Sequence, residues 1–289
     1  MVFGKVNETL VSVIMPVYKS RPDYLKASLS SILSQTYDNL EVIIVIDTTD
    51  KKRDAEIFDT IEAFKDDHRI QTIVRVANKG YCSALNTAIL RSSGTFIARL
   101  DSDDYWESSK IEKQMNLIRT SKIVLAGTWT SVVDEEGKKR GEIRTPVSTK
   151  SIRDLIMLHN PFVHSSIIFA RHVMNEVGFY NESFDGAEDY EFYLRVISRG
   201  YSCVNIPLFL TYLRESRNSI MRGNKWRNTR KSYFMAKCEA VTKLGYSKGS
   251  DMLFTLTSLG SILVTPRMGT HLKKAIGWYH PALSSRGGS

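Results

Sequence analysis

The chain has 289 residues, of which 42% are hydrophobic and 10% aromatic, enough to bury one large α/β domain with an extension, or two small domains. This composition excludes a low-complexity or repeat protein. The formal net charge of +9 is uneven, because residues 214–289 hold 14 Lys and Arg against 3 Asp and Glu, while residues 1–213 sum to −2.

Cysteine usage and hydropathy exclude further classes. Cys82, Cys203 and Cys238 are scattered singly without CxxC spacing, so neither a zinc knuckle nor a disulfide framework is predicted. A sparse, odd count fits a reducing cytosol. The first residues lack the apolar core of a signal peptide, and no run of 18 apolar residues occurs. We therefore expect a cytoplasmic protein without a membrane-spanning helix.

Strand and helix patterns alternate over the first hundred residues with the short spacing of βαβ units. The apolar runs are continuous, which is typical of strands covered on both faces. This predicts an α/β protein with a doubly wound, mostly parallel sheet flanked by helices, and a ligand crevice at the carboxyl ends of the strands. The predicted strands are 10–17, 40–46, 70–76 and 95–100, and the helices are 21–35, a segment through 57–64, and 81–92.

The pattern becomes mixed after about residue 123, and residues 226–279 predict two or three helices without a strand. The chain therefore combines an α/β region with a helical C-terminal extension. In the second half the predicted strands are 123–133, 140–145, 165–170 and a pair of short strands within 201–213, and the predicted helices are 149–158 and 187–199.

Asp101, Asp103 and Asp104 follow directly after a predicted buried strand. Carboxylates this close repel one another unless a cation or solvent relieves them. Hard oxygen ligands suit Mg²⁺ or Mn²⁺, which complete their shells with water and phosphate. The segment predicts a metal site with Asp101 and Asp103 as ligands. The alternative is a solvated acidic turn that caps a helix starting near Glu107.

Glu188 and Asp189 stand at the start of the predicted helix 187–199. The helix dipole stabilises acids at this position. A carboxylate there that faces the crevice can accept a proton from a substrate hydroxyl, which makes both residues catalytic candidates. The alternative is that they only cap the helix.

Asp47 ends the second predicted strand, where a carboxylate can accept hydrogen bonds from a base or a ribose. The alternative is a turn formed with Thr48 and Thr49. Neither GxGxxG nor GxxxxGK[ST] occurs, so a Rossmann dehydrogenase and a P-loop enzyme lack their phosphate-binding loop.

With these motifs the chain resembles glycosyltransferase family 2, inverting enzymes with a GT-A fold. The resemblance covers about residues 10–215 and implies a GT-A catalytic domain at 1–215, with a nucleotide-binding half of about 1–105 and an acceptor-binding half of about 106–215. Residues 216–289 are then a basic, mainly helical extension. Three ordered segments carry the resemblance: VSVIMPVYKSRPDYLKASLSSILSQTYDNLEVIIVID, NKGYCSALNTAILRSSGTFIARLDSDD and GAEDYEFYLRV.

The resemblance implies that a sugar is transferred from a nucleotide-sugar, expected to be a UDP-sugar, with Mn²⁺ or Mg²⁺ bridging the diphosphate of this donor. Asp103 would bind the metal, Asp101 would contact both the metal and the donor, and Asp189 would be the general base beside Glu188. One departure concerns the base: the family commonly has paired acids and a Gly-Ser turn where this chain has Ile46-Asp47-Thr48-Thr49. The implied donor-binding residues are Pro16, Val17, Tyr18, Asp47, Asn78, Gly80, Asp101 and Ser102.

The basic extension contains Trp226, Tyr233, Phe234, Met235 and the apolar run LFTLTSLGSILV. Basic and apolar helices together are typical of an interfacial membrane region, and the alternative is a helical cap on the catalytic domain. Chains that this one resembles often build bacterial surface polysaccharides, such as O-antigen or capsule, on lipid-linked saccharides. We therefore expect a peripheral position on the inner face of the cell membrane. No nucleic-acid module accompanies the charge.

Two rival functions remain open. A nucleotidyltransferase can also place acids at the end of a strand, although the early segment PVYKSRPD is poor in glycine. A non-catalytic, membrane-associated scaffold would not need the acids Asp101, Asp103 and Asp189.

Overall fold

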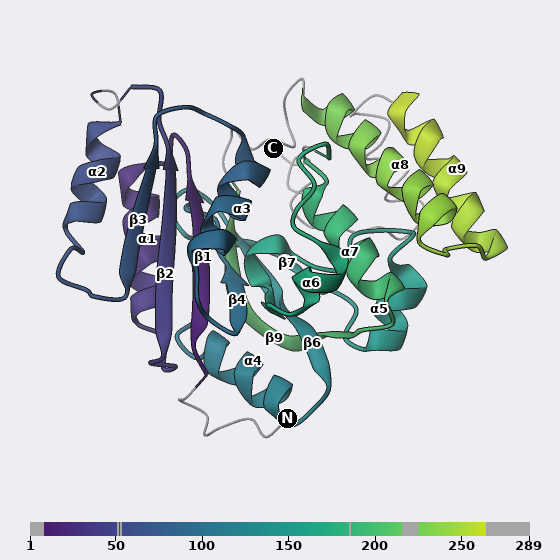
Figure 1. Cartoon of the computed structure of the whole chain (residues 1–289), viewed down its shortest axis with the longest axis horizontal. Coiled ribbons are helices and arrows are strands. Elements are labelled where there is room, and N and C mark those ends of the chain that lie inside the picture. Colours follow the sequence, from purple (N-terminus) through teal and green to yellow (C-terminus); the bar gives the residue numbers. More distant parts are fainter. Residues whose placement is uncertain (1–8, 51, 53, 185, 216–224, 264–289) are drawn as a thin grey trace, which may run out of the picture.

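The structure is a computed structural model, and it describes residues 9–50, 52, 54–184, 186–215 and 225–263 (Figure 1). Within these residues a single nine-stranded mixed sheet runs through the molecule, with helices packed on its faces. The predicted helical residues 264–279 lie outside the described part of the chain.

The first half of the chain forms the parallel part of the sheet. Its strands are β1 (Val11–Val17), β2 (Leu40–Asp47), β3 (Ile70–Arg75) and β4 (Phe96–Arg99). They pair in the order β3-β2-β1-β4, and every pair is parallel. All of β1 is buried, as is β2 except for Glu41, because helices cover both faces. The prediction from the continuous apolar runs is confirmed.

Three helices cover this half: α1 (Pro22–Leu33), α2 (Ala55–Glu62) and α3 (Tyr81–Arg91). Pro22 occupies the first turn of α1, where its fixed φ suits a helix and its missing N–H costs no hydrogen bond. Leu25, Leu29 and Ile32 form the buried face of α1 that their spacing predicts. Gly80 precedes α3 at a φ of +92°, which favours glycine.

The second half adds mostly antiparallel pairs. Its strands are β5 (Tyr105–Trp106), β6 (Ile123–Val133), β7 (Lys139–Ile143), β8 (Ile168–Ala170) and β9 (Ser202–Arg214). Beyond β4 the order is β8-β6-β9-β5, with β7 also paired to β6. Only β6 and β9 pair in parallel here, so the parallel sheet is confined largely to the first half.

Two strand predictions are wrong in detail. Residues 201–213 form one strand of 13 residues instead of two short ones. In β9, Ile206 and Phe209 pair with neighbouring residues of β6, so Pro207 and Leu208 form a bulge. Because proline has no N–H to donate, its presence in the sequence suggests the end of a strand. The predicted strand 165–170 is shorter than expected, because His164–Ser166 form a 3₁₀ turn and only β8 (Ile168–Ala170) is a strand.

The remaining helices are α4 (Lys110–Arg119), α5 (Thr149–Leu155), α6 (Val173–Val177), α7 (Glu188–Ser198), α8 (Lys225–Lys243) and α9 (Gly249–Leu263). α8 packs on α7, and α9 packs on the outer side of α8 (Figure 1). No helix in the described ranges is long and apolar enough to cross a bilayer.

Candidate active site

An acidic cluster forms in the turn after β4. One carboxylate oxygen from each of Asp101, Asp103 and Asp104 lies within 4.8 Å of the other two. Burial, followed by the charge of Asp101, raises the pKa of Asp103 to about 6. The same causes, with Asp103 added, hold the pKa of Asp104 well above its usual range. A divalent cation would relieve this repulsion, and three carboxylates are the oxygen donors that Mg²⁺ and Mn²⁺ prefer, so the residues fit such an ion.

The three acids are not equivalent. Asp104 is 1% exposed, and its carboxylate accepts hydrogen bonds from the Arg214 backbone N–H at 2.8 Å and from the Ser165 hydroxyl. Its backbone carbonyl accepts a hydrogen bond from Ser28. Asp104 therefore anchors the turn, whereas Asp101 and Asp103 are only partly buried and can reach a ligand.

Arg99, the last residue of β4, is a site residue that sequence reasoning missed. Its side chain is buried and pairs with Asp101, and it also donates to Ser165 Oγ at 2.9 Å. Its positive charge opposes the rise that burial causes in the pKa values of Asp103, Glu188 and Asp189. Arg99 thus acts on both acidic motifs. The available signal was a lone charge inside the apolar strand that precedes Asp101.

Several predicted donor-binding residues lie around the start of this cluster. Pro16 and Val17 are buried in β1, while Tyr18 directly after the strand is 44% exposed. Ser102 is buried, and its hydroxyl contacts that of Ser20 in the loop after β1. The carboxyl ends of β1 and β4 therefore meet through side chains.

Asp47 lies at the end of β2 and is buried. Arg75 of β3 binds it at two points, Nε to Oδ1 at 2.5 Å and Nη2 to Oδ2 at 2.7 Å. The same guanidinium donates to Ser83 and Thr87 of α3, each at 3.0 Å. Sequence reasoning did not identify Arg75 as the partner of Asp47.

Asn78 and Gly80 form the turn that leads into α3. The Asn78 side-chain oxygen accepts the Gly80 N–H at 3.0 Å. From the first turn of the same helix, the Tyr81 hydroxyl donates to Asp101 Oδ1 at 3.0 Å. This turn therefore connects the Asp47 side of the site to the acidic cluster through Tyr81.

Glu188 and Asp189 occupy the first turn of α7. Glu188 is 8% exposed, and its Oε2 has no hydrogen-bond partner among the residues that the structure describes. Burial, together with the adjacent Asp189, raises the pKa of Glu188 to about 8. Burial also raises the pKa of Asp189, although hydrogen bonds from the Tyr190 N–H at 2.6 Å and Asn160 Nδ2 at 2.7 Å oppose the shift. Burial thus raises the pKa of both acids, and the two hydrogen bonds to Asp189 limit the rise there.

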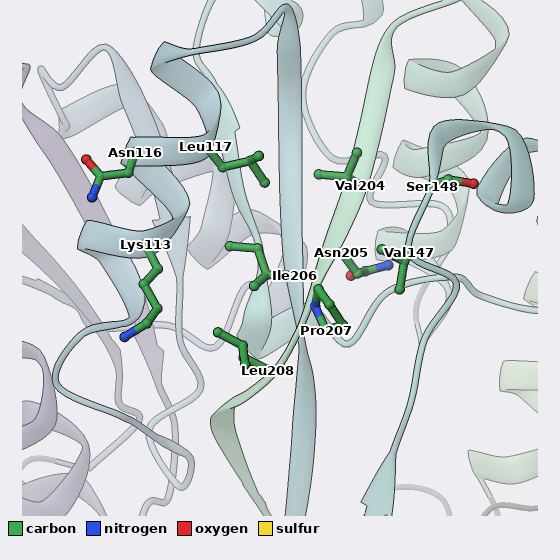
Figure 2. A pocket seen from close by; sticks show the side chains of 10 residues that line it. All are labelled: Lys113, Asn116, Leu117, Val147, Ser148, Val204, Asn205, Ile206, Pro207 and Leu208. Atoms are coloured by element: carbon green, nitrogen blue, oxygen red, sulfur yellow. The ribbon is translucent and has the colours of Figure 1, made fainter.

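A separate groove of about 580 Å³ lies between α4 and β9 (Figure 2). Its lining is mostly apolar, and it contains none of the predicted site residues. Pro207 and Leu208, which bulge out of the β9 ladder, form part of its lining.

The sequence matches the model of Glycosyl transferase family 2 over residues 12–179. It is 26% identical to the amylovoran biosynthesis glycosyltransferase AmsE of Erwinia amylovora, covering 88% of this chain and 96% of AmsE. It is 31% identical to WfaP of Escherichia coli, a UDP-Glc:alpha-D-GlcNAc-diphosphoundecaprenol beta-1,3-glucosyltransferase, covering 75% of this chain and 82% of WfaP.

Among solved structures, residues 1–349 of S. aureus TarS with UDP-GlcNAc superpose with a TM-score of 0.64 at 17% identity, covering 87% of this chain and 80% of that one. The match spans 40% of a longer TarS chain. The mannosyltransferase PcManGT of Pyrobaculum calidifontis with GDP-Man and Mn²⁺ gives a TM-score of 0.56 at 16% identity, covering 94% of this chain and 81% of that one. These likenesses agree with the predicted GT-A fold, and the family match shows that the chain belongs to glycosyltransferase family 2.

Proposed function

We propose that the chain transfers a sugar from a UDP-sugar to an acceptor hydroxyl with inversion at the anomeric carbon. The observation that carries the proposal is the pair of acidic motifs, Asp101–Asp104 and Glu188–Asp189, with the buried Arg99 acting on both. One motif suits a diphosphate-bound cation, and the other suits an acceptor.

On the donor side, Asp101 and Asp103 would hold Mn²⁺ or Mg²⁺, and Asp104 fixes the turn that carries them. When bound there, the cation would supply positive charge against the leaving diphosphate. The bound metal in PcManGT and the oxygen donors here support this assignment.

Asp47 recognises the base. Arg75 occupies one direction at each carboxylate oxygen, and a second lone pair on each remains able to accept a hydrogen bond from the base. Tyr18, exposed after β1, lies against the base or ribose, and Pro16 and Val17 form the buried floor under it.

On the acceptor side, Asp189 removes the hydroxyl proton as that oxygen attacks the anomeric carbon. The new C–O bond forms on the face opposite the diphosphate, and the old C–O bond breaks with its electron pair leaving on the diphosphate. One displacement inverts the configuration, and the beta-linked product in the name of WfaP supports this. Glu188, neutral near pH 7, donates a hydrogen bond to a sugar hydroxyl.

The acceptor is a lipid-linked saccharide in surface-polysaccharide synthesis, as the diphosphoundecaprenol acceptor in the name of WfaP supports. The chain works at the inner face of the cell membrane. α9 supports this position, because four apolar side chains on one side of it are 46–64% exposed: Met252, Leu253, Leu256 and Leu259.

Product analysis tests the reaction type. UDP-glucose and UDP-N-acetylglucosamine are each supplied with Mn²⁺ and undecaprenyl-diphosphate-linked N-acetylglucosamine. The proposal predicts free UDP and a β-linked disaccharide by NMR. Release of pyrophosphate would indicate the nucleotidyltransferase, and no turnover with either UDP-sugar would count against the proposed transfer and favour the scaffold.

A further inference from the structure

The carboxylate of Asp189 accepts a hydrogen bond from Asn160, a residue that lies outside α7 and outside both acidic motifs. Asn160, in the segment between α5 and the 3₁₀ turn, donates from Nδ2 to Asp189 Oδ2 at 2.7 Å. The Asn160 side-chain oxygen accepts the Phe162 N–H at 3.1 Å. The second contact fixes which end of the amide faces the carboxylate, since only the NH₂ group can donate to it.

The backbone around Asn160 is itself held in place. Asn205, buried in β9, donates to the Pro161 carbonyl at 3.0 Å and to the Pro146 carbonyl at 2.7 Å. A side chain at Gly127 would collide with Asn205, because a Cβ there would lie 2.1 Å from Asn205 Oδ1. Asn160, which donates the hydrogen bond to Asp189, is therefore held by its contact with the buried, closely packed strand β9.

Helix α8 of the C-terminal extension also contacts Asn160. Tyr233 of α8 stacks on Tyr190 with ring centroids 4.8 Å apart and an interplanar angle of 19°. Its hydroxyl lies 3.5 Å from Asn160 Nδ2, the atom that donates to Asp189. Tyr190 is fully buried, and its own hydroxyl donates to the Ile156 carbonyl at 2.7 Å. The buried and hydrogen-bonded ring of Tyr190 thus fixes the position of the Tyr233 phenol that stacks on it.

A second contact joins α8 to the acidic motif. A Cβ on Gly186 would lie 2.7 Å from Thr229 Oγ1 of α8, and Gly186 has a φ of +77°. Only glycine suits this position, two residues before Glu188. α8 therefore packs against the segment that begins α7 as well as against Asn160.

We infer that Asn160 and Tyr233 are positioning residues for the base, and that α8 is part of the catalytic site. Asn160 holds the Asp189 carboxylate toward the acceptor and favours its ionised form, and Tyr233 keeps the Asn160 amide in place. The inference rests on the proposed function of Asp189. Within the described part of the chain, the other charged or titratable groups that interact with Asp189 include Glu188, Tyr190 and Tyr193 on α7, Arg99 on β4 and Tyr180 before α7.

The test compares Asn160→Ala and Tyr233→Phe with wild type by UDP release from UDP-N-acetylglucosamine and UDP-glucose across pH 5–9. We expect Asn160→Ala to lower kcat about 10- to 100-fold and to move the acidic limb of kcat about one pH unit upward, because the carboxylate loses a donor. Tyr233→Phe should shift the limb in the same direction by less. UDP affinity should not change in either variant.

Two matched controls separate positioning from simple packing. Tyr246→Phe removes a hydrogen bond of 3.2 Å to the Leu194 carbonyl in the second half of α7, and Asn116→Ala changes an exposed asparagine on α4. Both should keep the wild-type pH profile. An unshifted acidic limb in Asn160→Ala with active wild type would overturn the inference. Wild-type turnover by Asp189→Asn would instead overturn the proposed base.

Discussion

Arg75 binds both carboxylate oxygens of Asp47 at the carboxyl ends of two neighbouring parallel strands, where the two residues are direct register partners. This contact holds a buried carboxylate in a fixed orientation at the edge where β1 and β4 also end. We expect the pair to act as one unit in recognising the base.

Substituting Asp47→Asn should weaken UDP binding about tenfold or more, because an amide cannot accept hydrogen bonds at both positions. Binding of inorganic pyrophosphate with Mn²⁺ should be unaffected, since that ligand has no base. Isothermal titration with both ligands measures the difference. Unchanged UDP affinity would remove Asp47 from base recognition.

Substituting Asp103→Asn should abolish the metal-dependent part of nucleotide binding. A thermal-shift panel of UDP, GDP, CDP and dTDP, each with Mn²⁺ and with chelator, identifies the nucleotide that stabilises wild type. For that nucleotide, the Mn²⁺-dependent shift should disappear in Asp103→Asn and persist in Asp59→Asn, which changes an exposed acid on α2. A full shift in Asp103→Asn would exclude its role as a metal ligand.

Substituting Glu188→Gln should stabilise the protein more at high pH than at low pH. The pKa of Glu188 rises from an ordinary 4.5 to about 8 on folding, so the folded state prefers the protonated acid. This preference contributes fully to the free energy of unfolding below about pH 4.5, and the contribution is lost as the pH rises through about 8. The loss is at most about 1.4 kcal/mol of unfolding free energy per pH unit.

Melting temperatures of wild type, Glu188→Gln and the exposed control Glu182→Gln between pH 5 and 9 measure this effect. The gap between Glu188→Gln and wild type should widen as the pH rises, while the control follows wild type. A constant gap would mean that Glu188 is ionised in the folded protein.

Substituting Leu253→Glu together with Leu256→Glu should reduce binding to vesicles of phosphatidylglycerol and phosphatidylethanolamine by at least about tenfold, because both leucines lie on the exposed apolar side of α9. Leu90→Glu, at a 69% exposed site on α3, is the control and should bind like wild type. Equal binding by all three proteins would leave α8 and α9 as a cap on the catalytic domain.

The parallel half of the fold could be predicted from the sequence because its signals are local. The apolar runs at β1 and β2 are continuous, and each is followed by a helix with a clear apolar face. The strands of the second half are harder to predict from the sequence, since β8 has only three residues and the bulge at Pro207 interrupts the strand pattern of β9. Short strands and bulges have no periodicity that identifies them.

The acids of the candidate site can be proposed from the sequence, but the side chains that contact them cannot. Asp101, Asp103, Glu188 and Asp189 stand in short motifs, whereas Asn160 meets Asp189 across 29 positions of the chain. Such pairings depend on tertiary structure, which spacing in one sequence does not encode. For the same reason, the sequence alone identifies Tyr233 only as an aromatic residue of the basic C-terminal extension.

The experiment that bears most directly on the proposed mechanism compares wild type with Asp189→Asn for two quantities, the affinity for the UDP-sugar with Mn²⁺ and the rate of UDP release. If Asp189 is the general base, the variant keeps its affinity within about twofold and loses at least about 100-fold in kcat. Near-normal turnover by Asp189→Asn would contradict the mechanism and require another residue to take the acceptor proton.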